Sequence, residues 1–142
     1  MRPSKAFTLV EVLIVVIILG ILAAIVVPQF TNASSDAKLS ALKTNLQTIR
    51  AQIQLYKLQH NDVFPALATF AEQMTLASKT DGSTAPIGTA GFDLGPYLQT
   101  LPANPYTNAN TIGSGAVGTS AWYYDDTTGT FRANDAAAHT GY

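Results

Sequence analysis

The sequence predicts an α+β fold in which a long N-terminal α-helix packs against a small C-terminal domain with a short helix and a small antiparallel β-sheet. Three features support this prediction: a continuous apolar run over residues 7–27, a one-sided apolar helical segment after it, and two strand-like runs within residues 121–133. With 142 residues, the chain has room for one domain besides a membrane segment.

The apolar run reads FTLVEVLIVVIILGILAAIVV and contains one charged residue, Glu11. As a helix of about 21 residues it would extend for about 31 Å, which is the thickness of the apolar part of a bilayer. A secretory signal peptide has a shorter apolar core followed by a small-residue cleavage site. Because Ala23 and Ala24 lie inside the run, we expect the segment to be retained as a single membrane-spanning helix.

The orientation of this helix follows from the residues that precede it. Arg2 and Lys5 stand before the apolar run, and positive residues favour the cytoplasmic side of a membrane. We therefore expect a cytoplasmic N-terminus and an extracytoplasmic C-terminal domain.

Two residues in and after the run are expected to make the helix flexible. Gly20 costs about 1 kcal/mol relative to Ala, but it lets another backbone approach closely. Pro28 removes a backbone donor and clashes with the preceding turn, so we expect a kink or local melting over residues 24–28. The alternative to a functional flexible segment is that Pro28 is simply a helix breaker tolerated at the membrane surface.

From Ser34 onward, apolar residues recur at alternating spacings of three and four, which predicts a second, amphipathic helical segment. We expect it to end at Gln59 or His60, so that the whole helix would measure about 80 Å. With fewer than three heptads and no paired charges, packing against the following domain is favoured over a coiled coil. The apolar stripe consists of Leu39, Leu42, Leu46, Ile49, Ile53 and Tyr56.

The remaining chain predicts short elements. Asn61, Asp62 and the Phe64-Pro65 step should end the long helix, because the residue before a proline avoids helical geometry. A short helix is expected over residues 66–77, and exposed loops over residues 79–91 and 108–120. The expected buried face of the short helix consists of Leu67, Phe70, Met74 and Ala77.

Residues 121–125 and 130–133 are β-prone and flank a turn that contains Gly129, which predicts a two-stranded hairpin. We expect Trp122, Tyr124 and Phe131 to cover the apolar stripe of the long helix. The alternative is an aromatic surface that stacks on sugars or single-stranded nucleic acid, which would make the protein a membrane-tethered binding module.

Composition argues against several other functions. The formal net charge is −1 and only 12% of residues are charged, so we expect no nucleic-acid partner. His60 and His139 are far apart in sequence and are expected at the surface. Since cysteine is absent, no catalytic constellation or transition-metal cluster is predicted. We expect no catalytic residues and a protein that is not an enzyme.

The N-terminus resembles a known family. A basic leader that ends in a small residue, then Phe-Thr-Leu-x-Glu and an uninterrupted apolar helix, resembles type IV pilins and the pseudopilins of type II secretion. The match extends through Phe7, Glu11, Gly20 and Pro28. It implies that a prepilin peptidase cuts between Ala6 and Phe7 and methylates the new amino group of Phe7; the family normally has Gly where this chain has Ala6.

Two later segments extend the resemblance. LQTIRAQIQLYKLQHNDVFP resembles the segment where pseudopilin helices end, and FDLGPYLQTLPANPYT resembles a run seen in G-type pseudopilins and related secretion proteins. The lack of a C-terminal disulfide loop also favours a pseudopilin over a type IV pilin. The resemblance implies a pilin-like fold with a leader at 1–6, a transmembrane and filament-core helix at 7–27, an amphipathic stem at 28–60 and a small periplasmic α+β domain at 61–142.

Glu11 has a physical reason to lie in the apolar run. An unpaired carboxylate at the edge of hydrocarbon is costly and is kept mainly where a partner compensates it. Cleavage before Phe7 would create a cationic amino group four residues from Glu11, on the same helix face. The resemblance implies that Glu11 neutralises this group on a neighbouring subunit; the alternative is a carboxylate that snorkels to the headgroups.

The resemblance implies a structural subunit of a type II secretion pseudopilus in the inner membrane, assembled through Glu11, Gly20 and Pro28. The alternative is a type IV pilin for adhesion, motility or DNA uptake. Implied partners are copies of this chain, other pseudopilins, a prepilin peptidase, a membrane platform protein and a cytoplasmic ATPase. G-type pseudopilins also bind calcium in a C-terminal loop. The oxygen ligands on offer are Asp125, Asp126 and Asp135, although the first two fit a hairpin turn equally well.

Overall fold

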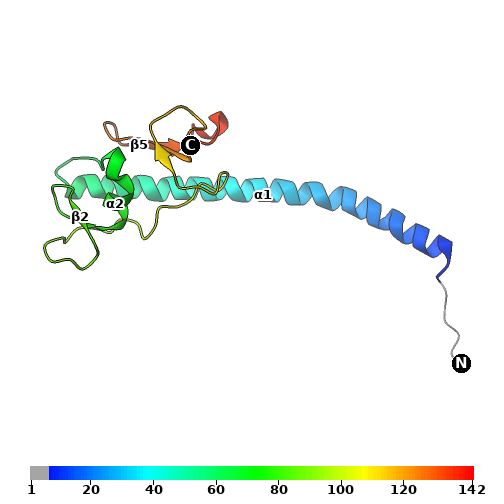
Figure 1. Ribbon diagram of the computed structural model, residues 1–142. Helices are drawn as coiled ribbons and strands as arrows, with labels where there is room; N and C mark the ends of the chain where they lie inside the picture. The colour runs from blue at the N-terminus through cyan, green and yellow to red at the C-terminus, as the bar shows by residue number, and fades with distance from the viewer. Residues whose placement is uncertain (1–6) are drawn as a thin grey trace, which may run out of the picture. The chain divides into compact units, whose positions relative to one another are not determined.

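The computed structural model describes residues 7–142, and one helix, α1 (Leu9–Gln59), makes up the first part of it (Figure 1). The chain forms two compact units, one up to Ala37 and one from Lys38 to Tyr142, and α1 contributes to both. The predicted end of the long helix at residue 59 or 60 is therefore confirmed.

The first unit contains an apolar stretch, Leu9–Val27, that is long and apolar enough to cross a membrane, with a mean hydropathy of 3.3. None of this stretch is buried inside the chain. The local melting expected before Pro28 is not observed, because α1 stays helical from Leu9 through Pro28 to Gln59. A proline removes only one backbone donor, and the hydrogen bonds of the turns on either side can keep the helix continuous.

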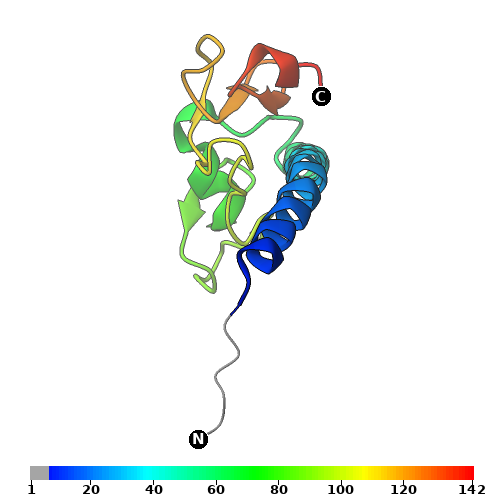
Figure 2. The same cartoon turned by 90° about the vertical axis from the view of Figure 1, so that its right-hand side faces the viewer.

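The second unit covers the apolar stripe on the C-terminal part of α1. Leu39 packs partly buried at its edge, and the remaining stripe residues are at most 1% exposed, which confirms the stripe as one face of the core. Within this unit, α2 and the strands lie on one side of the helix (Figure 2). The fully buried stripe residues are Leu42, Leu46, Ile49, Ile53 and Tyr56.

The predicted helix over residues 66–77 is shorter than expected. It consists of a 3-10 turn, η1 (Leu67–Thr69), followed by α2 (Phe70–Thr75). Ala77 instead belongs to β1 (Ala77–Ser78), since Leu76 is extended and Ser78 exchanges backbone hydrogen bonds of 2.8 and 3.1 Å with Leu94. β1 pairs antiparallel with β2 (Thr84–Ala85), which lies in the segment predicted to be a loop.

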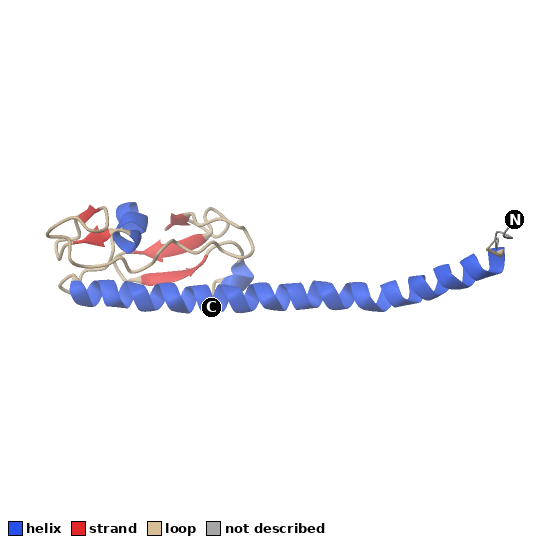
Figure 3. Ribbon diagram, turned by 90° about the horizontal axis from the view of Figure 1, so that it is seen from below, coloured by secondary structure: helices blue, strands red, loops and turns tan. Residues whose placement is uncertain are grey.

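A second sheet contains β3 (Ile112–Gly113), β4 (Trp122–Asp125) and β5 (Thr130–Ala133) (Figure 3). β4 and β5 form the predicted antiparallel hairpin, with Tyr124 opposite Phe131. β3 pairs parallel with β4, so the sheet is mixed, and part of the segment expected to be a loop is a strand. The α+β class is confirmed.

Three of the four aromatic residues of the hairpin are buried in the core. Trp122 and Tyr124 are 0% exposed and Phe131 is 1% exposed. The Trp122 indole N–H donates to the carbonyl of Pro102 at 2.9 Å, and the Tyr124 hydroxyl donates to that of Pro65 at 2.8 Å. Because these rings cover the stripe of α1, they are not available to stack on a sugar or a base, and that alternative is contradicted.

His60 is also buried, at 1% exposed, so the expectation of a surface histidine is wrong. Its ring stacks on that of Tyr56 with a centroid distance of 3.6 Å. Nδ1 lies 2.8 Å from the carbonyl oxygen of Tyr56, and Nε2 lies 3.2 Å from the Ser78 hydroxyl. Since a carbonyl only accepts, we assign a proton to Nδ1, and both ring nitrogens have a hydrogen-bond partner.

Candidate assembly site at the start of the long helix

The start of α1 is fixed by reciprocal hydrogen bonds between Thr8 and Glu11. The Thr8 hydroxyl accepts the backbone N–H of Glu11 at 3.2 Å. Glu11 Oε2 accepts the backbone N–H of Thr8 at 2.8 Å and its hydroxyl at 2.7 Å. This arrangement is a capping box, in which the N-cap residue and the residue three positions later satisfy backbone donors that would otherwise lack partners.

The capping box holds the Glu11 carboxylate at the N-terminal end of α1, four residues after Phe7 in sequence. Backbone N–H groups at a helix N-terminus carry a partial positive charge, which stabilises an anion there. Thr8 is a residue that our sequence analysis missed as a positioning group. The signal was present, because Thr-x-x-Glu before an apolar run is the sequence pattern of a capping box.

Phe7 and Thr8 precede the helix, and the Phe7 side chain is 80% exposed. The predicted cleavage site lies at the border of the described residues, since Ala6 falls outside them. Cleavage between Ala6 and Phe7 stays a prediction, as do the assembly roles of Glu11, Gly20 and Pro28.

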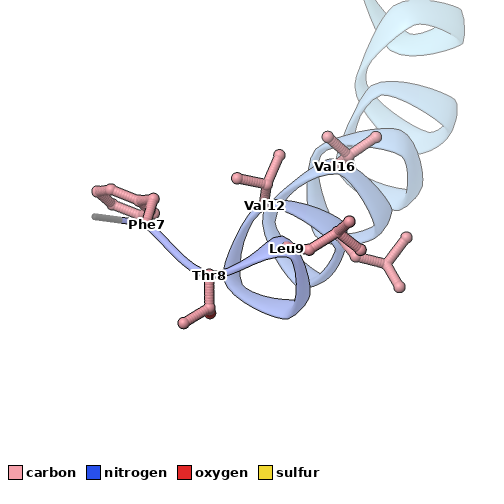
Figure 4. Close-up of a pocket in the computed structure, with 6 residues that line it drawn as sticks. Phe7, Thr8, Leu9, Val12 and Val16 are labelled. Atoms are coloured by element: carbon pink, nitrogen blue, oxygen red, sulfur yellow. The ribbon is translucent and has the colours of Figure 1, made fainter.

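An apolar surface groove runs along the same end of the helix (Figure 4). Its helical side chains recur at spacings of three and four, so they share one face of α1. Among residues 7–142, nothing packs on that face, because the large apolar side chains here are between 51% and 83% exposed. The groove is lined by Phe7, Thr8, Leu9, Val12, Leu13 and Val16.

Gly20 lies further along the same stretch. A Cβ atom added there would have no atom within 4 Å. No contact in the described part of the chain therefore requires a glycine at this position.

Comparisons with known proteins place this arrangement in a family. A family model described as a prokaryotic N-terminal methylation motif matches residues 1–27. The type II secretion system core protein G of Pseudomonas aeruginosa is 36% identical over 107 residues, which cover 75% of this chain and 71% of that protein. The chain belongs to the type II secretion system core protein G family.

Further relatives agree with this assignment. The core protein G of Vibrio cholerae is 32% identical over 108 residues, which cover 76% of this chain and 69% of that protein. The type IV major pilin protein PilA of Myxococcus xanthus is 48% identical over 46 residues, only 32% of this chain and 21% of that protein. No solved structure gives a significant match. This pseudopilin is a structural subunit of a pseudopilus, anchored by a single apolar helix, and its core protein G relatives are structural proteins.

The calcium candidates of this pseudopilin, Asp125 and Asp126, lie at the turn after β4. Asp125 Oδ1 accepts the backbone N–H groups of Thr127 at 2.9 Å and Thr128 at 3.3 Å. Asp126 Oδ2 accepts the backbone N–H of Leu67 at 2.9 Å. The N–H of Thr127 and the hydroxyl of Thr128 hold the pKa of Asp125 below its usual value.

These two carboxylates do not by themselves fit a calcium shell of about six to eight oxygen ligands, because each already has an oxygen in a hydrogen bond. Within residues 7–142, no group of three or more His, Cys, Asp or Glu could hold a metal ion. Asp135, the third candidate, instead contacts His139 Nδ1 at 2.6 Å and accepts the Asn104 side-chain amide at 2.8 Å. The sequence-based expectation is that no cofactor is bound, and calcium binding is its untested alternative.

Proposed function

We propose that this pseudopilin is cut between Ala6 and Phe7 by a prepilin peptidase, methylated on the new amino group of Phe7, and assembled into the type II secretion pseudopilus through residues 9–27. The Glu11 carboxylate forms an ion pair with the Phe7 amino group of a neighbouring copy. The observation that carries the proposal is an uncovered apolar helix face beside a carboxylate that the capping box already orients.

The energetics of the apolar stretch explain why this pair matters. Moving an apolar helix from lipid into a bundle of similar helices gains little hydrophobic free energy, because lipid tails are as apolar as leucine. Close packing at Gly20 and the pairing of a buried carboxylate with an ammonium group must then provide specificity. An unpaired Glu11 in such a bundle would cost several kcal/mol, so it selects for copies that have been cleaved.

The N-terminus of the helix faces the cytoplasm in this proposal, and the unit from Lys38 to Tyr142 lies in the periplasm. Assembly from the inner membrane needs a platform protein and a cytoplasmic ATPase, together with other pseudopilins. The second candidate function, a type IV pilin, is supported by the match of 46 residues to the Myxococcus pilin. The core protein G relatives match over 107 and 108 residues.

Intact-mass spectrometry of the chain from native membranes tests the processing step. We expect the mass of residues 7–142 plus one methyl group. An uncut chain, or a cut chain without the methyl group, would contradict the proposal. Loss of protein secretion on deletion, without loss of surface fibres or twitching, would separate a pseudopilus from a type IV pilus.

Glu11→Gln tests the charge pair separately from the capping box. The amide oxygen can still accept from Thr8, so the start of α1 should persist, while the ion pair is lost. We expect filaments to disappear in Glu11→Gln although the variant is cleaved and inserted in the membrane. Normal filaments in Glu11→Gln would show that the carboxylate serves only to cap the helix.

A further inference from the structure

The charged residues of the second unit are segregated by sign. Lys43, Arg50 and Lys57 follow one another at intervals of seven, which places them on one flank of the apolar stripe; we call them the basic edge. Between Leu39 and Gln59 there is no acidic residue. After α1 the balance reverses, with two cations, Lys79 and Arg132, against seven carboxylates. These carboxylates are Asp62, Glu72, Asp81, Asp93, Asp125, Asp126 and Asp135.

These charges do not neutralise one another within the chain. Among residues 7–142, the one ion pair within 4.0 Å joins Asp135 to His139, and no lysine or arginine takes part in one. The lysines of the basic edge instead lie over aromatic rings, with the Lys43 amine 4.6 Å from the Tyr142 ring centre and the Lys57 amine 4.5 Å from that of Phe64. Their formal charges therefore have no carboxylate partner in this part of the chain.

Three of the carboxylates gather where α1 ends; we call Asp62, Asp81 and Asp126 the acidic end. Asp62 follows the helix directly, and Asp81 lines a cavity together with Tyr56 on the last turns of α1. Asp126 accepts the backbone N–H of Leu67, just past the turn that leaves α1. All three are exposed. Beside them, two apolar side chains are uncovered, Leu58 at 77% exposed and Val63 at 62% exposed.

A surface groove on the basic edge has complementary chemistry. Lys43, Leu46, Gln47, Arg50 and Tyr142 line it. Because Leu46 is 1% exposed, Tyr142, at 37% exposed, forms the accessible apolar floor, which is bordered by two cations. The Arg50 guanidinium is held in place, since its Nε donates to the carbonyl of Phe131 at 2.8 Å and another nitrogen donates to the carbonyl of Tyr142. The groove suits a partner segment that presents both apolar side chains and carboxylates.

Lys43 and Asp62 of one copy cannot meet each other. Residues 43 and 59 belong to the same continuous helix and are separated by about 24 Å along its axis. The backbone N–H of Asp62 donates to the carbonyl of Lys57 at 3.0 Å, which holds Asp62 at this end of α1. A pair between Asp62 and Lys43 must therefore join two copies.

We propose that the basic edge of one copy docks the acidic end of a second copy. Leu58 and Val63 of the second copy lie against the groove, and Asp62 pairs with Lys43. The two contacting surfaces differ, so a pair of copies still has one free basic edge and one free acidic end. A contact of this type can therefore repeat, and it builds a helical filament when it does not close into a ring. The inference rests on the proposed function, because it names a contact between subunits of the same pseudopilus.

Cysteine cross-linking tests this contact directly, because the native chain has no cysteine. The full-length chain carrying Lys43→Cys and Asp62→Cys is assembled in native membranes and oxidised. The distance within one copy excludes an internal disulfide, so every bridge joins two copies. We expect a ladder of dimers, trimers and longer products. The matched control carries Lys43→Cys and Asp93→Cys, which moves the second cysteine to an exposed carboxylate outside the acidic end, and should give no ladder.

Charge changes give an independent readout. Placing an acid opposite the acidic end is costly, so Lys43→Glu should reduce the yield of sheared filaments at least about tenfold. Lys79→Glu makes the same charge change at an exposed lysine beside Asp81, where it adds negative charge to the acidic end, and should not lower the yield. Asp62→Asn should lower the yield as well, since it removes the charge and keeps a residue that tolerates the positive φ of 62° at this position.

The outcomes separate this inference from the proposed function. If the unaltered chain forms no filaments, both fail. If it forms filaments while the Lys43→Cys and Asp62→Cys pair stays monomeric on oxidation, only this inference fails. A ladder of equal strength from the control pair, or equal losses in Lys43→Glu and Lys79→Glu, would also overturn it.

Discussion

Two stretches of the same helix have similar apolar residues and opposite surroundings. Within Leu9–Val27, the large apolar side chains are between 45% and 83% exposed, whereas the stripe from Leu42 to Tyr56 is at most 1% exposed. The pattern explains the difference, because a stripe on one face can be covered by a small domain, but a helix that is apolar all round cannot. The stripe is therefore buried within the chain, whereas Leu9–Val27 requires lipid or other helices to cover it.

The strongest test of this comparison uses one substitution in each stretch. Leu46→Ala removes a side chain that is 1% exposed, and the resulting cavity should lower the free energy of unfolding by about 2–5 kcal/mol. Leu13→Ala removes one that is 52% exposed and should change it by less than about 0.5 kcal/mol. Denaturation of the full chain in detergent, followed by the fluorescence of the single tryptophan, Trp122, measures both. Similar losses of unfolding free energy in Leu46→Ala and Leu13→Ala would refute the difference between the two stretches.

The glycines offer a second contrast. Gly129 has a φ of 71°, and a Cβ atom there would lie 2.3 Å from the ring of Phe64. Gly129→Ala should therefore lower the stability of the second unit by about 1–3 kcal/mol. Gly20→Ala, which meets no atom within 4 Å, should leave the Trp122 unfolding curve unchanged. A stable Gly129→Ala variant would mean that the turn and Phe64 can move apart freely.

In the first unit, order at the start of α1 should depend on local hydrogen bonds. Thr8→Val removes the capping hydroxyl at nearly constant volume and should cost about 1 kcal/mol of helix stability. Amide hydrogen exchange over residues 9–12 should accelerate roughly fivefold. Thr8→Ser, which keeps the hydroxyl, should exchange as the unaltered chain does. The unfolding curve followed by Trp122 should be the same in the unaltered chain, Thr8→Val and Thr8→Ser. A shifted curve would show that the stabilities of the two units are coupled.

The smallest expected effect is a pH dependence confined to the second unit. The pKa of Asp125 is held below its ordinary value of 3.8, first by the backbone N–H of Thr127. Its carboxylate therefore stabilises the fold above pH 3.8, and this contribution is lost as the pH falls through the lower pKa of the folded state. Asp125→Asn keeps an acceptor oxygen that does not titrate, so its urea midpoint should fall less steeply in acid. Identical acid profiles would show that Asp125 contributes nothing.

Elements with a sequence period were predictable. The spacing of three and four between Leu42 and Tyr56 reflects burial of one helix face, and the β-prone runs around Gly129 reflect a hairpin. Both patterns arise because burial selects apolar side chains at the repeat of the backbone.

Elements held by distant backbone partners were not predictable. β3 has only two residues, and Trp122 joins it by donating its N–H to the carbonyl of Thr111 at 3.0 Å. His60 is buried because Asn61 and Asp62 take positive φ angles of 53° and 62° and because Ser78, far along the chain, supplies its second partner. A strand of two residues, such as β3, is too short to show a periodic sequence pattern, and a single histidine such as His60 shows none.

The candidate site divides in the same way. The capping box was readable from Thr8-x-x-Glu11, since both residues lie within one helical turn. The assembly roles predicted for Glu11, Gly20 and Pro28 concern a second copy, and a single chain has no contact in which they could be expressed.

The core of the second unit also sets the order of events during synthesis. The stripe on α1 leaves the ribosome first, and the strands that cover it, β4 and β5, are made about seventy residues later. At ordinary translation rates this interval is on the order of ten seconds. During that time the chain has its membrane helix but an open apolar stripe, so a nascent subunit is anchored before it is folded. Only a chain translated through Ala133 can close its own core.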